Sequence, residues 1–209
     1  MGALLHNKYL FVHINKSAGG IITKNMSLNG KLKIDGVHRT LADCLNIAKH
    51  LNINTEDLHI STSVRNPWDR MLSLYLFYKY KHRSPEFYSG NPSIDDSFNE
   101  WIKFIYSNNF NRNLTHGGVN VFKHCFSNQL NWLKDKNGQL IPVDKILRHE
   151  EYSAELEPYL RDILKLETVV LERVHATKHD HYSTYYNNTT RDLVAEHYAE
   201  DIEYFNYTY

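Results

Sequence analysis

The strongest constraint on the fold is a short apolar run that ends in a polar turn with two glycines. Residues 8–14, with Tyr9–Val12 at their centre, have the length and composition of a buried strand. The turn His13–Gly20 follows, and residues 19–27 predict the start of a helix. Residues 58–64 form a second predicted strand that also runs into a helix. Repeated strand–turn–helix units favour a parallel sheet.

The rest of the chain continues this alternation. The second helix begins at Pro67, with Asn66 as its N-cap and Asp69 in its first turn. Apolar spacing predicts further helices at 40–51, 97–106 and 188–205, and strands at 143–148 and 168–172. We therefore predict an α/β fold, a P-loop-like and mainly parallel sheet flanked by helices, in a single domain over residues 1–209.

Composition limits the partners. Lys+Arg and Asp+Glu both total 24, so the basic excess of a nucleic-acid-binding protein is missing. No early segment has the length and apolar character of a signal peptide or a membrane span. The two cysteines, Cys44 and Cys125, are expected to be buried free thiols. We expect a cytoplasmic protein that binds no nucleic acid and does not span a membrane, and its oligomeric state stays open.

The first turn has the features of an anion site. Backbone N–H groups at a helix start point toward a ligand, and the helix dipole adds roughly half a positive charge. Gly19 and Gly20 allow close approach, and Lys16 adds a full charge. The pattern differs from the usual phosphate-binding loop, because the lysine precedes the glycines. The alternative is an ordinary β–α turn with a surface lysine.

A second candidate anion site begins at the end of residues 58–64. Arg65 directly precedes the N-cap, and Ser73 lies two turns along the helix on nearly the same face. A guanidinium group donates two parallel hydrogen bonds to a phosphate, and the serine hydroxyl can share that anion. The alternative is that Arg65 pairs with Asp69 and that Ser73 has no ligand.

Together the two segments resemble the sulfotransferases that use 3′-phosphoadenosine 5′-phosphosulfate (PAPS), in the branch that includes carbohydrate sulfotransferases. Residues 11–21 are similar to the family's 5′-phosphosulfate loop, F-V-H-I-P-K-T-A-G-T-S. Residues 64–75 match its 3′-phosphate motif, V-R-N-P-[YW]-D-R-x-x-S-x-Y, without a break. The resemblance implies that these residues bind the cofactor: Lys16, Ser17, Ala18, Gly19, Gly20, Ile21, Arg65 and Ser73.

Three positions depart from the family pattern. Asn15 replaces a proline, which makes the turn less rigid. Gly20 and Ile21 stand where the family often has Thr and Ser, whose hydroxyls help to bind the phosphates. We therefore expect backbone amides and Ser17 to contribute more here.

The resemblance implies sulfuryl transfer from PAPS to a hydroxyl or amine of a small-molecule or carbohydrate acceptor. Lys16 would stabilise the leaving 5′-phosphate. His38 matches the family's histidine before the helix between the two motifs, and it is the predicted general base. Alternative bases or acceptor contacts are His13, His175, His179 and His181, and the family's cofactor-contacting loop would here offer Arg173 or Lys178.

Other functions remain as alternatives. The segments His179-Asp180-His181 and His149-Glu150-Glu151 could suggest a metal site, but no third ligand stands at metal-site spacing, and we expect no metal. Arg148 and Glu150 match an R-x-E element of the family, for which a buried ion pair is expected. A nucleotide-binding module without chemistry and a small-molecule kinase are the competing classes. Against a kinase, the chain has neither a Walker lysine nor an evident carboxylate for magnesium.

Overall fold

The computed structural model of the chain describes residues 2–34, 38–80, 97–107, 112–113, 115–116, 119–120, 123, 125–172 and 179–209. The chain divides into two compact units. The first comprises Met1–Arg65 and Gln129–His175, and the second comprises Asn66–Asn128 and Ala176–Tyr209.

The first unit is built on a four-stranded sheet with the order β1-β2-β3-β6. The strands are β1 (Ala3–Leu5), β2 (Tyr9–Val12), β3 (His59–Val64) and β6 (Lys145–Arg148). β2, β3 and β6 run parallel, whereas β1 pairs antiparallel with β2. The predicted α/β fold with a mainly parallel sheet is therefore confirmed.

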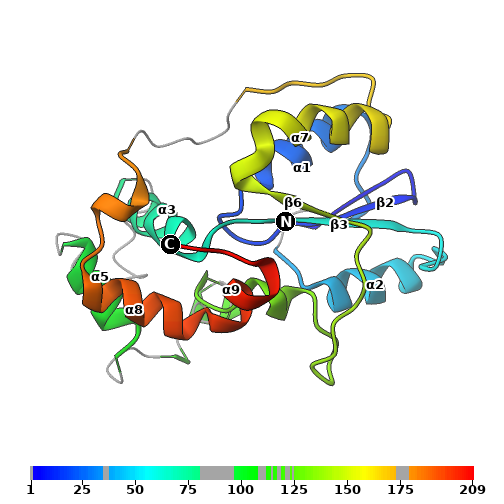
Figure 1. Cartoon of the computed structure of the whole chain (residues 1–209). Helices are drawn as coiled ribbons and strands as arrows, with labels where there is room; N and C mark the ends of the chain where they lie inside the picture. Colours follow the sequence, from blue (N-terminus) through cyan, green and yellow to red (C-terminus); the bar gives the residue numbers. More distant parts are fainter. Residues whose placement is uncertain are drawn as a thin grey trace. The chain divides into compact units, whose positions relative to one another are not determined.

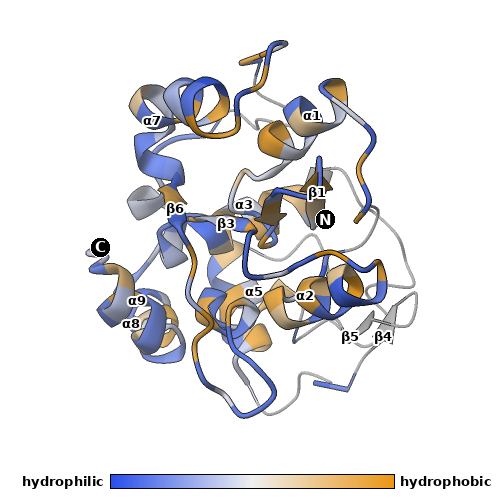
Figure 2. Cartoon of the chain, turned by 90° about the vertical axis from the view of Figure 1, so that its right-hand side faces the viewer, coloured by the Kyte–Doolittle hydropathy of each residue, from blue (hydrophilic) through white to orange (hydrophobic). Residues whose placement is uncertain are grey.

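Helices cover both faces of this sheet (Figure 1). α1 (Gly20–Leu28) and α7 (Tyr152–Pro158) pack on one face, where they meet Tyr9 and Phe11 of β2. α2 (Leu41–His50) packs on the other face, against the alternate side chains of the same strand. Because the strand is buried on both sides, its sequence is continuously apolar. Figure 2 shows the hydrophobic residues of β1, α1 and α2 that form these two layers.

The predicted strand at 168–172 is wrong. This segment is irregular, and side chains of α1 and of its C-cap residue hold its backbone. Asn25 accepts from the N–H of Val170 at 2.7 Å and donates to its carbonyl at 2.9 Å. Asn29 makes the same pair of bonds with Thr168, at 2.9 and 2.7 Å. The backbone groups that a strand would give to a neighbour are thus satisfied by two asparagines.

The second unit is mainly helical. Its described helices are α3 (Pro67–Tyr80), α5 (Phe98–Ile105), α8 (Asn188–His197) and α9 (Ala199–Phe205), and β4 (Thr115–His116) pairs antiparallel with β5 (Val119–Asn120). The single helix predicted over 188–205 is interrupted at Tyr198, whose φ of −104° and ψ of 23° leave the helical range. The ring of Tyr198 is fully buried, and its hydroxyl donates to the carbonyl of Phe126 at 3.0 Å. This buried anchor lies where the helix breaks.

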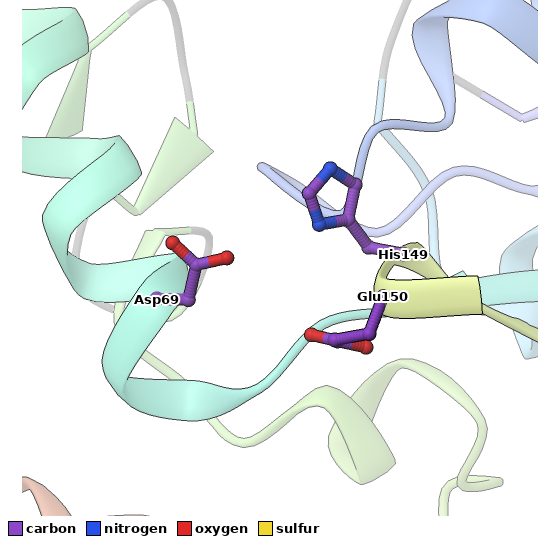
Figure 3. Close-up of side chains that lie close together, drawn as sticks. All are labelled: Asp69, His149 and Glu150. Atoms are coloured by element: carbon purple, nitrogen blue, oxygen red, sulfur yellow. The ribbon is translucent and has the colours of Figure 1, made fainter. Parts of the chain in front are cut away.

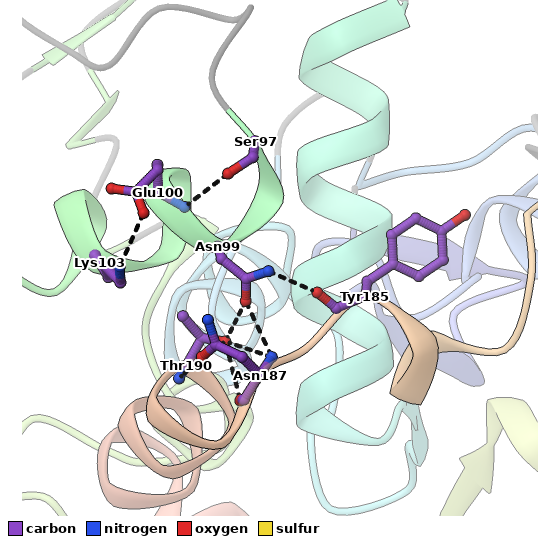
Figure 4. Close-up of polar contacts among 7 residues, drawn as sticks. All are labelled: Ser97, Asn99, Glu100, Lys103, Tyr185, Asn187 and Thr190. Carbon is purple, nitrogen blue, oxygen red and sulfur yellow. Dashed lines mark hydrogen bonds and ion pairs between the residues drawn. The ribbon is translucent and has the colours of Figure 1, made fainter.

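A polar network joins α5 to the start of α8 (Figure 4). Asn99 donates to the carbonyl of Tyr185 at 2.9 Å and accepts from the N–H of Asn187 at 3.1 Å. Asn187 and Thr190 form a capping box at the N-terminus of α8. One asparagine of α5 therefore fixes where α8 begins.

Four short helical turns complete the described chain: η1 (Gln129–Trp132), η2 (His149–Glu151), η3 (Tyr159–Ile163) and η4 (Tyr182–Thr184). Among the described residues, no helix combines the length and the apolar character needed to cross a bilayer.

Candidate active site

In the first unit, the residues to which the resemblance gives a role in cofactor binding lie at one edge of the sheet. β2 and β3 are parallel neighbours, with Val12 opposite Thr62, so the turn after β2 and Arg65 after β3 leave the sheet at the same edge. Ligands of open parallel sheets bind beyond this carboxyl edge. A direct contact joins the two segments, because the hydroxyls of Ser17 and Ser63 lie 3.1 Å apart.

The backbone of the turn is held in an unusual conformation. Lys16 and Ala18 have left-handed φ values of 63° and 61°, which non-glycine residues avoid at a cost of about 1–2 kcal/mol each. Gly19 follows in the right-handed helical region, with φ −62° and ψ −10°. Alternation of left- and right-handed residues turns successive N–H groups toward one point and forms an anion-binding concavity.

Gly19 is required by packing. A Cβ there would lie 2.5 Å from Cδ2 of His13 and 2.8 Å from Cε1 of Phe11, closer than real Cβ contacts come. The turn can therefore approach β2 only with a glycine at this position.

Gly20 and Ile21, which replace the family's Thr and Ser at the start of α1, differ in their surroundings. Gly20 is the first helical residue, and a Cβ there would meet nothing within 4 Å. Ile21 is buried among apolar side chains that include Leu156 of α7. A hydroxyl side chain thus has room at position 20, whereas position 21 belongs to the hydrophobic core.

Ser17 holds the turn in place. Its buried hydroxyl donates to the carbonyl of Ile14 at 2.7 Å and contacts the hydroxyl of Ser63. Tyr152 of α7 donates weakly to the Ser17 carbonyl at 3.5 Å. Burial raises the pKa of Tyr152, and its hydrogen bond to Ser63 opposes part of that rise, so the phenol stays a neutral donor. The Ser17 hydroxyl is thus occupied by bonds within the protein.

Arg65 is largely buried, and its backbone is held by a residue that sequence reasoning missed. The side-chain amide of Gln129 accepts from the Arg65 N–H at 2.9 Å and donates to the Arg65 carbonyl at 2.9 Å. These residues are 64 positions apart, and no local pattern around Gln129 indicates the contact.

The start of α3 has the predicted cap. Asn66 accepts from the N–H of Trp68 at 3.1 Å, and its carbonyl accepts from the N–H of Arg70 at 2.8 Å. Asp69 lies in the first turn (Figure 3). Ser73 is half-buried on the same helix, within the second unit.

The second arginine of the motif, Arg70, is bonded within the helical unit. Arg70 is fully buried and donates to the carbonyls of Ser127 and Cys125, at 3.0 and 3.2 Å. Its guanidinium also lies 5.8 Å from the centre of the Tyr198 ring. Arg70 therefore stabilises the helical unit, while Arg65 stands at the sheet edge.

His38 lies beside the base of the turn. Its Nδ1 is 2.9 Å from the carbonyl oxygen of His13, which can only accept, so Nδ1 carries the hydrogen. In the neutral ring Nε2 then holds the lone pair that a general base needs. The His38 ring also lies 4.7 Å from the His13 ring and 6.1 Å from the Trp132 ring, measured between centroids.

The other candidate histidines differ in position. His13 is buried under the turn. His179 and His181 are exposed in the second unit, where Nδ1 of His181 lies 2.8 Å from the Ser183 hydroxyl. His149 and Glu150 directly follow β6 (Figure 3). Three of the predicted contacts lie outside the described residues: His175, Arg173 and Lys178.

Comparison with known proteins adds one match. The model of the Sulfotransferase family matches residues 5–208, which is almost the whole chain. No curated protein and no solved structure matches it. The matched region includes the turn, Arg65, Ser73 and His38. The chain therefore belongs to the sulfotransferase family.

Proposed function

We propose that this sulfotransferase uses PAPS as its donor and transfers the sulfuryl group to a hydroxyl or amine of a small-molecule or carbohydrate acceptor. The observation that carries the proposal is the common sheet edge at which the left-handed turn and Arg65 meet, joined by the Ser17–Ser63 contact. Such an edge offers two separate sets of anion donors, as a nucleotide with phosphates on both the 3′ and the 5′ oxygen of its ribose requires.

The turn is proposed to bind the 5′ end of the donor. Its N–H groups and Lys16 would hold the phosphate, and their interaction strengthens as negative charge develops on the leaving oxygen. In the transfer, the acceptor atom bonds to sulfur while the bond from sulfur to the bridging phosphate oxygen breaks. The residues of the turn position these reactants in line, and no metal is assigned to the step.

Arg65 and Ser73 are proposed to bind the 3′-phosphate. Arg65 leaves the sheet at the edge that also bears the turn, and Ser73 follows on the helix that begins two residues later. A guanidinium fork suits a phosphate monoester, which AMP lacks at its 3′ position.

His38 is proposed to accept the proton of the acceptor hydroxyl. The bond from Nδ1 to the His13 carbonyl supports this role, because it leaves Nε2 as the basic nitrogen. An amine acceptor or an acidic phenol would need this base less.

Calorimetry with adenosine 3′,5′-bisphosphate and with AMP tests the donor. We expect the bisphosphate to bind more tightly, and we expect Arg65→Ala to weaken it by about 1.5–3 kcal/mol, the range for hydrogen bonds to charged groups. Equal affinities in the wild-type protein would remove the 3′-phosphate assignment. Transfer of labelled sulfate from PAPS to a panel of acceptors then separates an enzyme from a binding module, and ATP-dependent phosphorylation of the same panel would instead indicate a kinase.

A further inference from the structure

Gln129 bonds both backbone groups of Arg65. It is fully buried in η1, with its Oε1 2.9 Å from the Arg65 nitrogen and its Nε2 2.9 Å from the Arg65 oxygen. The ladder between β3 and β6 ends at the pair Val64 and Arg148, one residue earlier. The Gln129 side chain therefore pairs with the first residue beyond the sheet as a neighbouring strand would.

This arrangement bears on where the Arg65 side chain can reach. The direction in which that side chain leaves the sheet edge depends on the φ and ψ of Arg65, and the two bonds hold them. Burial of the Gln129 amide costs little free energy, because its oxygen and one of its N–H groups are both hydrogen-bonded. Loss of both bonds would leave the backbone of Arg65 less ordered. A displacement of about 1 Å in a positioning group is enough to weaken a charged contact strongly.

We propose that Gln129 is a positioning residue for the 3′-phosphate contact and that it acts on the nucleotide only through Arg65. The inference rests on the proposed function, which assigns that phosphate to Arg65. The same turn bears Trp132, whose ring lies 6.1 Å from that of His38. η1 thus contacts both the candidate phosphate ligand and the candidate base.

A double-mutant cycle with Gln129→Met and Arg65→Ala tests the inference. The quantity measured by calorimetry is the ratio of the dissociation constant of AMP to that of adenosine 3′,5′-bisphosphate. We expect Gln129→Met to lower this ratio roughly tenfold, the effect of about 1.4 kcal/mol, and to leave the affinity for AMP unchanged. In the Arg65→Ala background the same substitution should lower it no further. Asn131→Ala is the matched control, because this exposed residue of η1 contacts Lys134.

The outcomes separate the inference from the function on which it rests. Three results would overturn the role of Gln129 and leave the proposed function intact. The first is an unchanged ratio in Gln129→Met, and the second is an equal loss of affinity for both nucleotides. The third is an effect of Gln129→Met that multiplies with that of Arg65→Ala. A wild-type protein without preference for the bisphosphate, or an Arg65→Ala variant that keeps it, would overturn both.

Thermal unfolding monitors the fold of each variant. If Gln129→Met does not fold, Gln129→Asn replaces it in the cycle, since it keeps the uncharged amide on a side chain too short to reach both backbone groups of Arg65. The same three criteria then apply to Gln129→Asn, with a smaller fall in the ratio expected.

Discussion

His38 donates the hydrogen on Nδ1 to the carbonyl of His13, over 2.9 Å, and this single bond determines which nitrogen of the ring is basic. His13 directly follows the strand that leads into the turn proposed to bind the donor phosphate. The tautomer of the candidate base is therefore set by the backbone of the element that is proposed to bind the donor.

We expect His38→Ala to lower turnover by about 10²–10⁴, the usual contribution of a positioned base. Affinity for adenosine 3′,5′-bisphosphate should stay nearly unchanged, because the base acts on the acceptor. Labelled-sulfate transfer on the identified hydroxyl acceptor measures the first effect, and calorimetry the second. His50→Ala is the control, since its Nδ1 makes a similar backbone bond, to Asn46 at 2.7 Å, at an exposed position. Near-normal turnover in His38→Ala would move the base to another residue.

Lys16→Met should weaken both bisphosphate binding and turnover. The charge of Lys16 meets the phosphate before reaction and interacts more strongly with the leaving group, so the loss in turnover should exceed the loss in binding. The loss in binding is expected at about 1.5–3 kcal/mol. Lys31→Met removes an exposed lysine of the same unit and serves as the control. A variant that binds normally and turns over normally would exclude Lys16 from the site.

Much of the sheet was predictable from the sequence because its signals are local. β2 is a short apolar run and β3 carries β-branched residues at alternate positions, and the cap at Asn66 follows from the residues next to it. The failures involve distant partners. The segment 168–172 has strand-like composition, yet Asn25 of α1 and Asn29, the C-cap of that helix, take its backbone bonds.

In the candidate site, too, features with a local sequence signal were predictable and contacts between distant residues were not. Lys16, Gly19 and Arg65 could be named from their positions after predicted strands, but the sequence does not tell that Gly19 packs on His13 and Phe11. Gln129 has no local pattern that connects it to Arg65. The expected ligand role of Ser17 stays a prediction, and its hydroxyl is engaged with Ile14 and Ser63 in the structure.

The stability of the helical unit should depend on pH through His197. Burial lowers the pKa of this residue from its ordinary value of 6.5, and Arg112 and Arg70 lower it further, against a hydrogen bond to Phe126 that raises it. Because the unfolded chain binds the proton more readily, the stabilising contribution is complete above 6.5 and falls as the pH drops from there toward the folded value.

The melting temperature should accordingly fall between pH 7 and pH 5, and His197→Gln should make that fall smaller. The glutamine amide can still donate to the Phe126 carbonyl, which His197 contacts at 2.8 Å, but it does not titrate. His181→Gln, at an exposed position of the same unit, is the control. Identical pH profiles for His197→Gln and the wild-type protein would contradict the assignment.

Restoring a hydroxyl side chain at position 20 and at position 21 should change the stability of the protein in opposite directions. A Cβ at position 20 meets nothing within 4 Å, so Gly20→Thr should fold normally and gain helix stability of several tenths of a kcal/mol. Its hydroxyl stands at the helix N-terminus, where it can donate to a bound phosphate. We expect bisphosphate affinity to rise by up to about tenfold, the value of one such bond.

Ile21→Ser should instead destabilise the first unit by about 2–5 kcal/mol, because Ile21 is buried against the side chains of α1, α7 and the sheet. Denaturant unfolding and calorimetry on both variants check the pair, and Gly20→Ala separates the helix effect from the hydroxyl effect. If Gly20→Thr binds the bisphosphate no better than Gly20→Ala does, the start of α1 does not contact a phosphate. If Ile21→Ser keeps its stability, the packing of α1 against α7 is looser than the buried contacts of Ile21 indicate.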